Sequence, residues 1–108
     1  MELTINEALN QAIIAQKTGD FQKAESYYMA ILRQQPDHSD VNHNMGVLAN
    51  NIGRVDKAMT FFEKSIKSNP NITQYWLSYI NMLIEQNQMD EANRAFEKAV
   101  EKGVTRDP

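Results

Sequence analysis

The sequence repeats itself with a period of 34 residues. At that interval a small residue, an aromatic residue and a residue that ends a helix return in register. The aligned sets are Ala24, Ala58 and Ala92; Tyr28, Phe62 and Phe96; Pro36 and Pro70; and Gly19, Gly53 and Asn87. A fixed period of about 20 to 50 residues is typical of stacked units that bury their apolar faces against one another. We therefore expect three similar units that share one core.

Apolar residues recur at helical spacing through most of the chain, and we find no strand pattern. The expected helices cover residues 4–17, 21–34, 39–51, 55–67, a segment that begins at residue 73, and residues 89–102. The fold class that follows is all-α, a right-handed α-solenoid of three helix-turn-helix units in a single domain of residues 1–108. The expected units span about residues 5–38, 39–72 and 73–106.

Polar residues and glycines mark where these helices begin and end. Thr4 and Glu7 have the spacing of a capping box, in which each side chain satisfies a backbone amide of the first turn. Ser39 and Thr73 are the expected N-caps of the third and fifth helices. Gly103 follows the last helix, where glycine adopts positive φ at little cost. These signals support the helix boundaries independently of the apolar spacing.

Composition narrows the classes of partner and environment. The 108 residues carry a net charge of −3 with both signs scattered, so the clustered Lys and Arg of a nucleic-acid-binding surface are missing. No cysteine is present, which excludes disulfides and thiolate metal sites. No apolar run approaches the ~20 residues of a membrane span, and MELTINEALNQ lacks the basic segment of a signal peptide. We expect a soluble cytoplasmic protein with no cofactor and no nucleic-acid or membrane partner.

One cluster of polar residues has the composition of a metal site. His38, Asp40 and His43 lie close together in the sequence, but a structural zinc site needs four ligands. We therefore expect a helix cap beside ordinary surface histidines. The chain contains no nucleophile elbow, phosphate-binding loop or Cys/His pair, so we expect no catalysis by this chain.

An aromatic cluster, formed by Tyr75, Trp76 and Tyr79, has the composition of a stacking platform. Trp76 and Tyr79 fall at packing positions of the repeat, so we expect them in the core. Tyr75 is then the member expected to be more exposed.

The periodic residues resemble those of tetratricopeptide repeats. The middle unit shows the pattern most fully with Gly46, Gly53, Ala58, Phe62 and Pro70. The third unit has a tryptophan at the expected place, but it has Ile80 where a small residue is usual and Val104 in place of proline. The resemblance covers nearly the whole chain and implies a module that binds other proteins. It says little about the partner, because the defining residues are packing residues.

A narrower resemblance concerns HNMGVLA and NPNITQYWLSYINMLIEQNQMDEA. These segments resemble the repeats found N-terminal to bacterial glycosyltransferases of the O-linked N-acetylglucosamine transferase type. Similar repeats precede sulfotransferases and methyltransferases. The resemblance implies a recognition arm of a larger enzyme.

In such an array the first helix of each unit lines a concave groove. The repeat register places these residues in the peptide-binding groove: Asn6, Asn10, Ile13, Lys17, Asp40, His43, Asn44, Val47, Asn51, Gln74, Ser78 and Asn81. Asn10 and Asn44 occupy equivalent positions. In the transferases an asparagine ladder at this place grips the substrate backbone, which implies the same role for these two residues. Ser78 breaks the ladder, and the alternative is a polar face that only keeps the surface soluble.

The same positions argue against one well-known ligand of the family. Co-chaperone repeats hold the C-terminal carboxylate of a heat-shock chaperone with a clamp of Lys, Asn and Arg. The matching places here are Leu9, Ile13, Asn44, Gln74 and Ser78, and only Asn44 fits. No cation is available to pair with the carboxylate, so we do not expect that ligand.

The last helix is expected to present an apolar stripe of Phe96, Ala99 and Val100 to water, because no capping helix follows it. Such a stripe indicates a partner surface. Two explanations remain open: the native chain continues, or two copies form a homodimer through this helix. Self-association is therefore the alternative function.

Overall fold

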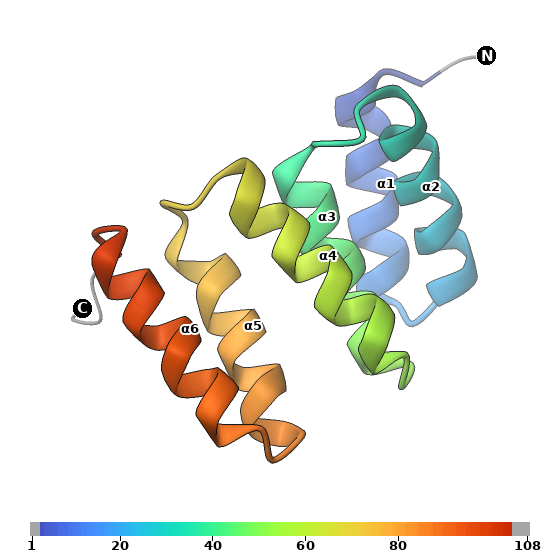
Figure 1. The fold of residues 1–108 in the computed structure, drawn as a ribbon. Helices are drawn as coiled ribbons and strands as arrows, with labels where there is room; N and C mark the ends of the chain where they lie inside the picture. The colour runs from blue at the N-terminus through green and yellow to red at the C-terminus, as the bar shows by residue number, and fades with distance from the viewer. Residues whose placement is uncertain (1–2, 105–108) are drawn as a thin grey trace.

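The computed structural model describes residues 3–104, which form six α-helices and no strand (Figure 1). The helices are α1 (Ile5–Lys17), α2 (Phe21–Gln34), α3 (Ser39–Asn51), α4 (Val55–Ser68), α5 (Thr73–Glu85) and α6 (Met89–Glu101). They form three consecutive pairs that follow one another along a molecule of 46 × 26 × 25 Å. The predicted all-α array of helix pairs is confirmed. None of the described helices is long and apolar enough to cross a membrane.

The turn between the two helices of each pair uses a left-handed residue. Gly53 has a φ of 83°, and the aligned Asn87 has a φ of 60°. Asparagine is one of the few residues with a side chain that tolerates this region. After each turn an amide donates to a carbonyl of the preceding helix at 2.8 Å, as from Arg54 to Ala49 and from Gln88 to Leu83. Asn87 therefore does in the third unit what glycine does in the second.

Some of the predicted helix caps are confirmed and others are wrong. Thr4 caps α1 in the predicted capping box, with its amide donating to Glu7 Oε1 at 2.9 Å. The prediction that Ser39 caps α3 is wrong, because Ser39 is the first helical residue and the His38 side chain is the cap. The prediction that Thr73 caps α5 is wrong by one residue in the same way. The N-cap is Ile72, and its side chain forms no capping hydrogen bond. Several other helix ends differ from prediction by one residue.

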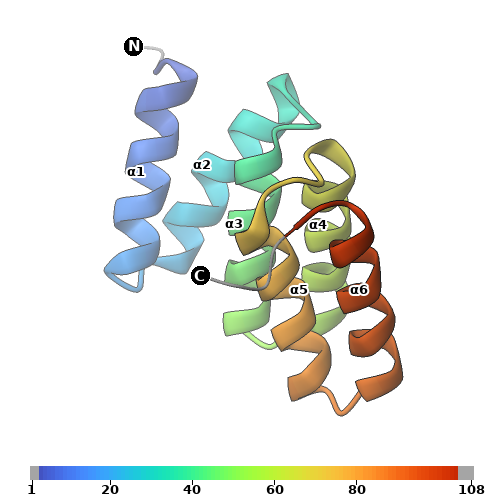
Figure 2. The ribbon, with the colours of Figure 1, turned by 90° about the vertical axis from the view of Figure 1, so that its left-hand side faces the viewer.

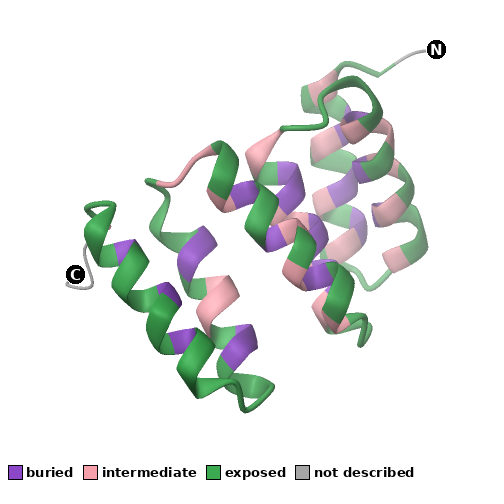
Figure 3. Cartoon of the chain, in the orientation of Figure 1, coloured by how far each residue is buried: buried purple, intermediate pink, exposed green. Residues whose placement is uncertain are grey.

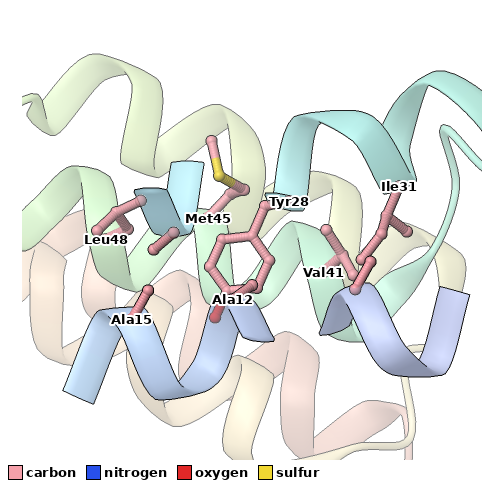
Figure 4. Close-up of a cluster of buried hydrophobic side chains, with 9 residues drawn as sticks. Ala12, Ala15, Tyr28, Ile31, Val41, Met45 and Leu48 are labelled. Atoms are coloured by element: carbon pink, nitrogen blue, oxygen red, sulfur yellow. The ribbon is translucent and has the colours of Figure 1, made fainter. Parts of the chain in front are cut away.

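The first two units share a core built on the repeated small and aromatic positions (Figure 4). Ala12 and Ala24 are fully buried, which lets α1 and α2 approach closely. Tyr28 fills the space between this pair and α3, and its hydroxyl donates to Gln16 Oε1 at 2.6 Å. Burial raises the pKa of Tyr28 to about 12. The aromatic position thus joins one unit to the next, as the period predicts.

Within the second unit the aromatic residue packs directly on the small residue of the preceding helix. A Cβ at Gly46 would lie 2.5 Å from two ring carbons of Phe62, a distance that side chains do not adopt. Phe62 is 1% exposed and shares a cluster with Ala58 and with Met82 of α5. Glycine at position 46 is therefore needed for the ring to occupy this place.

One buried polar residue was not singled out by the sequence. Asn42 is 1% exposed, and its Nδ2 donates to the carbonyls of Pro36 and His38, both at 3.0 Å. Trp76, one repeat later, donates its indole N–H to the carbonyl of Pro70 at 2.8 Å. The two side chains differ in shape, but each donates a hydrogen bond to the equivalent proline carbonyl in the loop before its helix. In the sequence, the only sign that Asn42 is buried is its alignment with Trp76, 34 residues later.

The third unit departs from the first two at its outer side (Figure 3). Ile80 occupies the place of Gly46, and Phe96, the counterpart of Phe62, is 39% exposed. Val100 is also exposed, as predicted, but Ala99 is only 5% exposed. The predicted stripe therefore loses Ala99, which faces inward with the other alanines of α6.

Candidate peptide-binding surface

The predicted binding residues lie on the first helix of each pair, and Figure 2 shows α1, α3 and α5 on one side of the molecule with α4 and α6 on the other. This side is termed the inner surface. It is defined by Asn6, Asn10, Ile13, Lys17, Asp40, His43, Asn44, Val47, Asn51, Gln74, Ser78 and Asn81. All of these residues are exposed or half-buried. Every one of them is therefore at least partly accessible to a ligand.

Polar side chains of α3 and α5 bond to one another between the second and third units. His43 Nε2 lies 2.8 Å from Ser78 Oγ, and Gln74 Nε2 donates to the same oxygen at 3.3 Å. Asn50 Nδ2 donates to Glu85 Oε1 at 3.4 Å. A ligand would have to compete with these bonds, so the α3–α5 part of the inner surface offers less unused hydrogen-bonding capacity.

The prediction that Tyr75 is the exposed member of the aromatic cluster is wrong. Tyr75 is 3% exposed, and its ring stacks on His43 with centroids 5.1 Å apart. Its hydroxyl donates to Asp40 Oδ1 and lies 3.2 Å from Ser39 Oγ. Burial raises the pKa of Tyr75 to about 12, and the bond to Asp40 acts in the same direction. Tyr75 therefore joins α5 to α3 and is not a stacking platform.

The amide side chains that form no hydrogen bond with another described residue lie on other parts of the inner surface. Asn6 and Asn10 on α1 and Asn81 on α5 are exposed, and their side chains bond to no other described residue. Asn44 is half-buried, and its amide interacts with the Tyr28 hydroxyl. The two equivalent asparagines thus differ, because Asn10 is fully available and Asn44 is partly engaged.

The histidines do not converge on a shared site. His38 Nδ1 accepts from the amide of Val41 at 3.2 Å, while His43 packs between Tyr75 and Phe62, 5.1 and 5.7 Å between ring centroids. Across residues 3–104, no three His, Asp or Glu side chains are grouped so that they could hold a metal ion.

The ionisation of His43 is coupled to this packing. Burial lowers the pKa of its imidazole below the usual 6.5, although the Asn44 amide and the Asp40 carboxylate both favour the charged form. Well above pH 6.5 the ring is neutral in the folded and the unfolded chain, so it adds no pH dependence there. As the pH falls below 6.5, the unfolded chain takes up the proton first, and the folded state loses stability.

We expect the melting temperature to fall when the pH is lowered from about 7 to about 5.5, because this window contains the unfolded pKa of His43. His43→Gln cannot titrate, so its melting temperature should change less over the same window. Circular dichroism melts of both proteins at matched ionic strength measure the difference. The same pH response in both proteins would exclude His43 as its source.

Shallow pockets also lie outside the inner surface. One of about 250 Å³ lies between α4, α5 and α6, and its walls include Trp76, Arg94 and Lys98. Another of about 420 Å³ lies between α2 and α4, with Met29 and Phe61 in its walls. Both have mixed charges and apolar walls, which define no particular ligand chemistry.

Comparison with known proteins identifies a family whose sequence model matches the chain and solved structures that share its fold. The sequence model of the tetratricopeptide repeat matches residues 15–79. The photosystem I assembly protein Ycf3 of Acaryochloris marina is 31% identical over 97 residues, covering 81% of this chain and 58% of Ycf3. The crystal structure of MamA superposes with a TM-score of 0.84 at 21% identity, covering 93% of this chain and 58% of MamA.

A mutant of the O-GlcNAc transferase of Thermobaculum terrenum also superposes on the chain, with a TM-score of 0.81 at 25% identity. This match covers 94% of the present chain but only 20% of the transferase. The chain thus spans little more than half of Ycf3 and MamA and a fifth of the transferase.

Proposed function

The chain belongs to the tetratricopeptide repeat family, whose repeats mediate protein–protein interaction, and we propose that it binds an extended segment of a partner protein along the inner surface. The observation that carries this proposal is the set of exposed amides at Asn6, Asn10 and Asn81, which form no bond with another described residue. An amide offers a carbonyl acceptor and an NH₂ donor. This pair matches the C=O and N–H groups of an extended backbone.

The contacts between α3 and α5 support a binding position nearer the first two units. Ser78 is engaged by His43 and Gln74, so the third unit contributes little at the ladder position. Asn10 and Asn44, one repeat apart, then form the centre of the proposed grip. The inner surface carries one cation, Lys17, and one anion, Asp40, so it favours a segment without strong net charge.

The double variant Asn10→Ala and Asn44→Ala is expected to weaken peptide binding at least about fivefold, since each amide contributes a net hydrogen bond to the ligand backbone. The probe is a peptide selected by phage display against the unmodified chain, and affinity is measured by fluorescence anisotropy. The melting temperature should change by only a few degrees, because neither residue is fully buried.

Gln22→Ala with Asn71→Ala is the matched control, because it removes two exposed amides outside the inner surface. The control should retain the original affinity. If the peptide binds the Asn10 and Asn44 double variant as tightly as the unmodified chain, the proposed grip is excluded.

We also propose that the chain is the recognition arm of a larger enzyme. The similarity to part of an O-GlcNAc transferase supports this proposal, since the matched region is a fifth of that protein. An antibody raised against the 108-residue chain should detect a longer polypeptide in cell extracts. Detection of a product no longer than the chain itself would exclude the proposal.

A further inference from the structure

The C-terminal ends of α1, α3 and α5 lie along one edge of the inner surface. The three helices run in the same direction in Figure 2, with these ends at the lower side of the view. Their last helical residues are Lys17, Asn51 and Glu85, which occupy equivalent positions of the repeat and are all exposed. These three residues are termed the edge row. The edge row has a cation in the first unit, a neutral amide in the second and an anion in the third.

The helix backbones strengthen this polarity. The carbonyl groups at the C-terminal end of a helix carry partial negative charge, which a basic residue in the last turn offsets. Lys17 is such a residue in α1, whereas the last turns of α3 and α5 contain none. The edge row therefore becomes more negative from the first unit to the third.

The charge of Glu85 does not serve the stability of its own helix. An acidic residue at the C-terminal end of α5 is unfavourable, because it lies beside the partial negative charge of the carbonyl groups. Among the described residues, its carboxylate accepts one long hydrogen bond, from Asn50 Nδ2 at 3.4 Å. A neutral glutamine would accept the same bond. A negative charge at position 85 is therefore better explained by a ligand than by the fold.

The cation of the edge row is also available to a ligand. Within residues 3–104 the ion pairs join Arg54 to Glu25 and Arg94 to Glu91, and Lys17 takes part in neither. An ammonium group that is exposed and unpaired can bind a carboxylate of a partner.

The turns after α1 and α3 carry charges in the opposite order, but both charges are engaged with α2. Asp20 Oδ1 accepts a hydrogen bond from the Lys23 amide at 3.2 Å, at the start of α2. Arg54 Nη1 lies 4.0 Å from Glu25 Oε2, also on α2. Lys17 and Glu85 are therefore the charges that a ligand meets along the edge row.

One further charge of the inner surface follows the order of the edge row. Asp40 lies in the second unit, at the other end of α3, and its carboxylate accepts a hydrogen bond from the Tyr75 hydroxyl. Taken with the edge row, the inner surface is positive in the first unit and negative in the second and third.

We propose that the edge row sets the direction of the bound segment, and that this segment carries an acidic residue at its end over α1 and a basic residue at its end over α5. The inference rests on the proposed function, because the row acts on a segment held by the amides of the inner surface. Amides alone accept a backbone in either direction, since N–H and C=O groups recur along it. The two charges disfavour the reversed segment.

The probe is an uncharged core peptide, selected by phage display against the chain from a library without Asp, Glu, Lys or Arg. Two extended peptides with blocked ends are made from this core. One carries two Glu before it and two Lys after it, and the other has the reverse order. Their composition and net charge are the same, so general attraction cannot distinguish them. Fluorescence anisotropy should show affinities that differ at least about threefold, and added salt should reduce the difference.

Variants of the edge row then test the assignment. The charge swap Lys17→Glu with Glu85→Lys keeps the net charge of the chain and should reverse the order of the two affinities. Lys17→Gln with Glu85→Gln removes both charges and should make the two affinities equal. If the charge swap leaves the original order unchanged, the edge row does not set the direction and the inference is overturned.

Lys67→Glu with Glu101→Lys is the matched control. These residues end α4 and α6 at positions 34 residues apart, and both are exposed and outside the inner surface. This swap should keep the original order of the two peptides. A reversal in the control as well would place the charged ends of the peptides outside the edge row and would overturn the inference.

The core peptide separates this inference from the proposed function. If it loses affinity for the double variant at Asn10 and Asn44, but the two charged peptides bind the unmodified chain equally, the grip stands and the inference is overturned. If the core peptide binds that double variant unchanged, the grip itself is excluded, and the inference with it.

Discussion

Replacing Phe62 with alanine is expected to lower the free energy of unfolding by about 3–5 kcal/mol, the range for deleting a buried aromatic side chain. Phe62 is 1% exposed and lies between Gly46 of its own unit and Met82 of the next. Its loss leaves a cavity at the junction that helix backbones cannot close. For a chain of this length the melting temperature should fall by more than about 10 °C. Urea unfolding followed by circular dichroism measures the change.

Phe96→Ala is the matched control, because Phe96 holds the same repeat position but is 39% exposed. Its truncation creates no closed cavity, so it should cost less than about half as much as Phe62→Ala. Equal losses at the two positions would contradict the conclusion that the aromatic residue works by joining one unit to the next.

The fold could be predicted because its main determinants are local and periodic. Ala24, Ala58 and Ala92 return in phase, and all three are buried in the structure. The turns were equally readable, since Gly53 and its counterpart Asn87 both adopt positive φ. A repeat protein places each residue in nearly the same surroundings as its counterparts, so one alignment of the chain with itself predicts many contacts.

The errors arose where a residue's environment is set by another unit. Tyr75 lies beside a core tryptophan, and helical spacing alone does not show that it turns toward His43 and Asp40 of α3. Serine and aspartate are the usual N-caps, so the sequence does not favour His38 as the cap of α3. The burial of Asn42 is also not predictable from the sequence, because it depends on two loop carbonyls that accept hydrogen bonds from its amide.

For the inner surface too, the sequence predicts which residues lie there but not which partners they bond to. The repeat register identified its residues, but it did not show that His43 and Ser78 bond to each other. Side chains at equivalent positions of a repeat point in the same direction, but they do not contact the same partners. Asn10 is exposed for this reason, whereas Asn44 is half-buried beside Tyr28. Which amides remain available to a ligand is therefore a property of the folded array.

Gly46→Val is expected to destabilise the chain by about 3 kcal/mol, the upper part of the range for overpacking a core. A Cβ at this position would already lie 2.5 Å from two carbons of the Phe62 ring, and valine adds two further methyl groups. The third unit shows the structural alternative, because Ile80 replaces the glycine there and Phe96 is 39% exposed. Urea unfolding of the variant gives the loss directly.

A double-mutant cycle tests whether the loss comes from this one contact. Phe62→Leu shortens the side chain opposite the new valine, so the double variant should be more stable than Gly46→Val alone. Ser26→Val, at an exposed position of α2, measures the effect of valine on a helix without packing and should cost well under 1 kcal/mol. If the two core changes simply add, the ring of Phe62 is not what requires glycine at position 46. The close approach of α3 and α4 would then need another explanation.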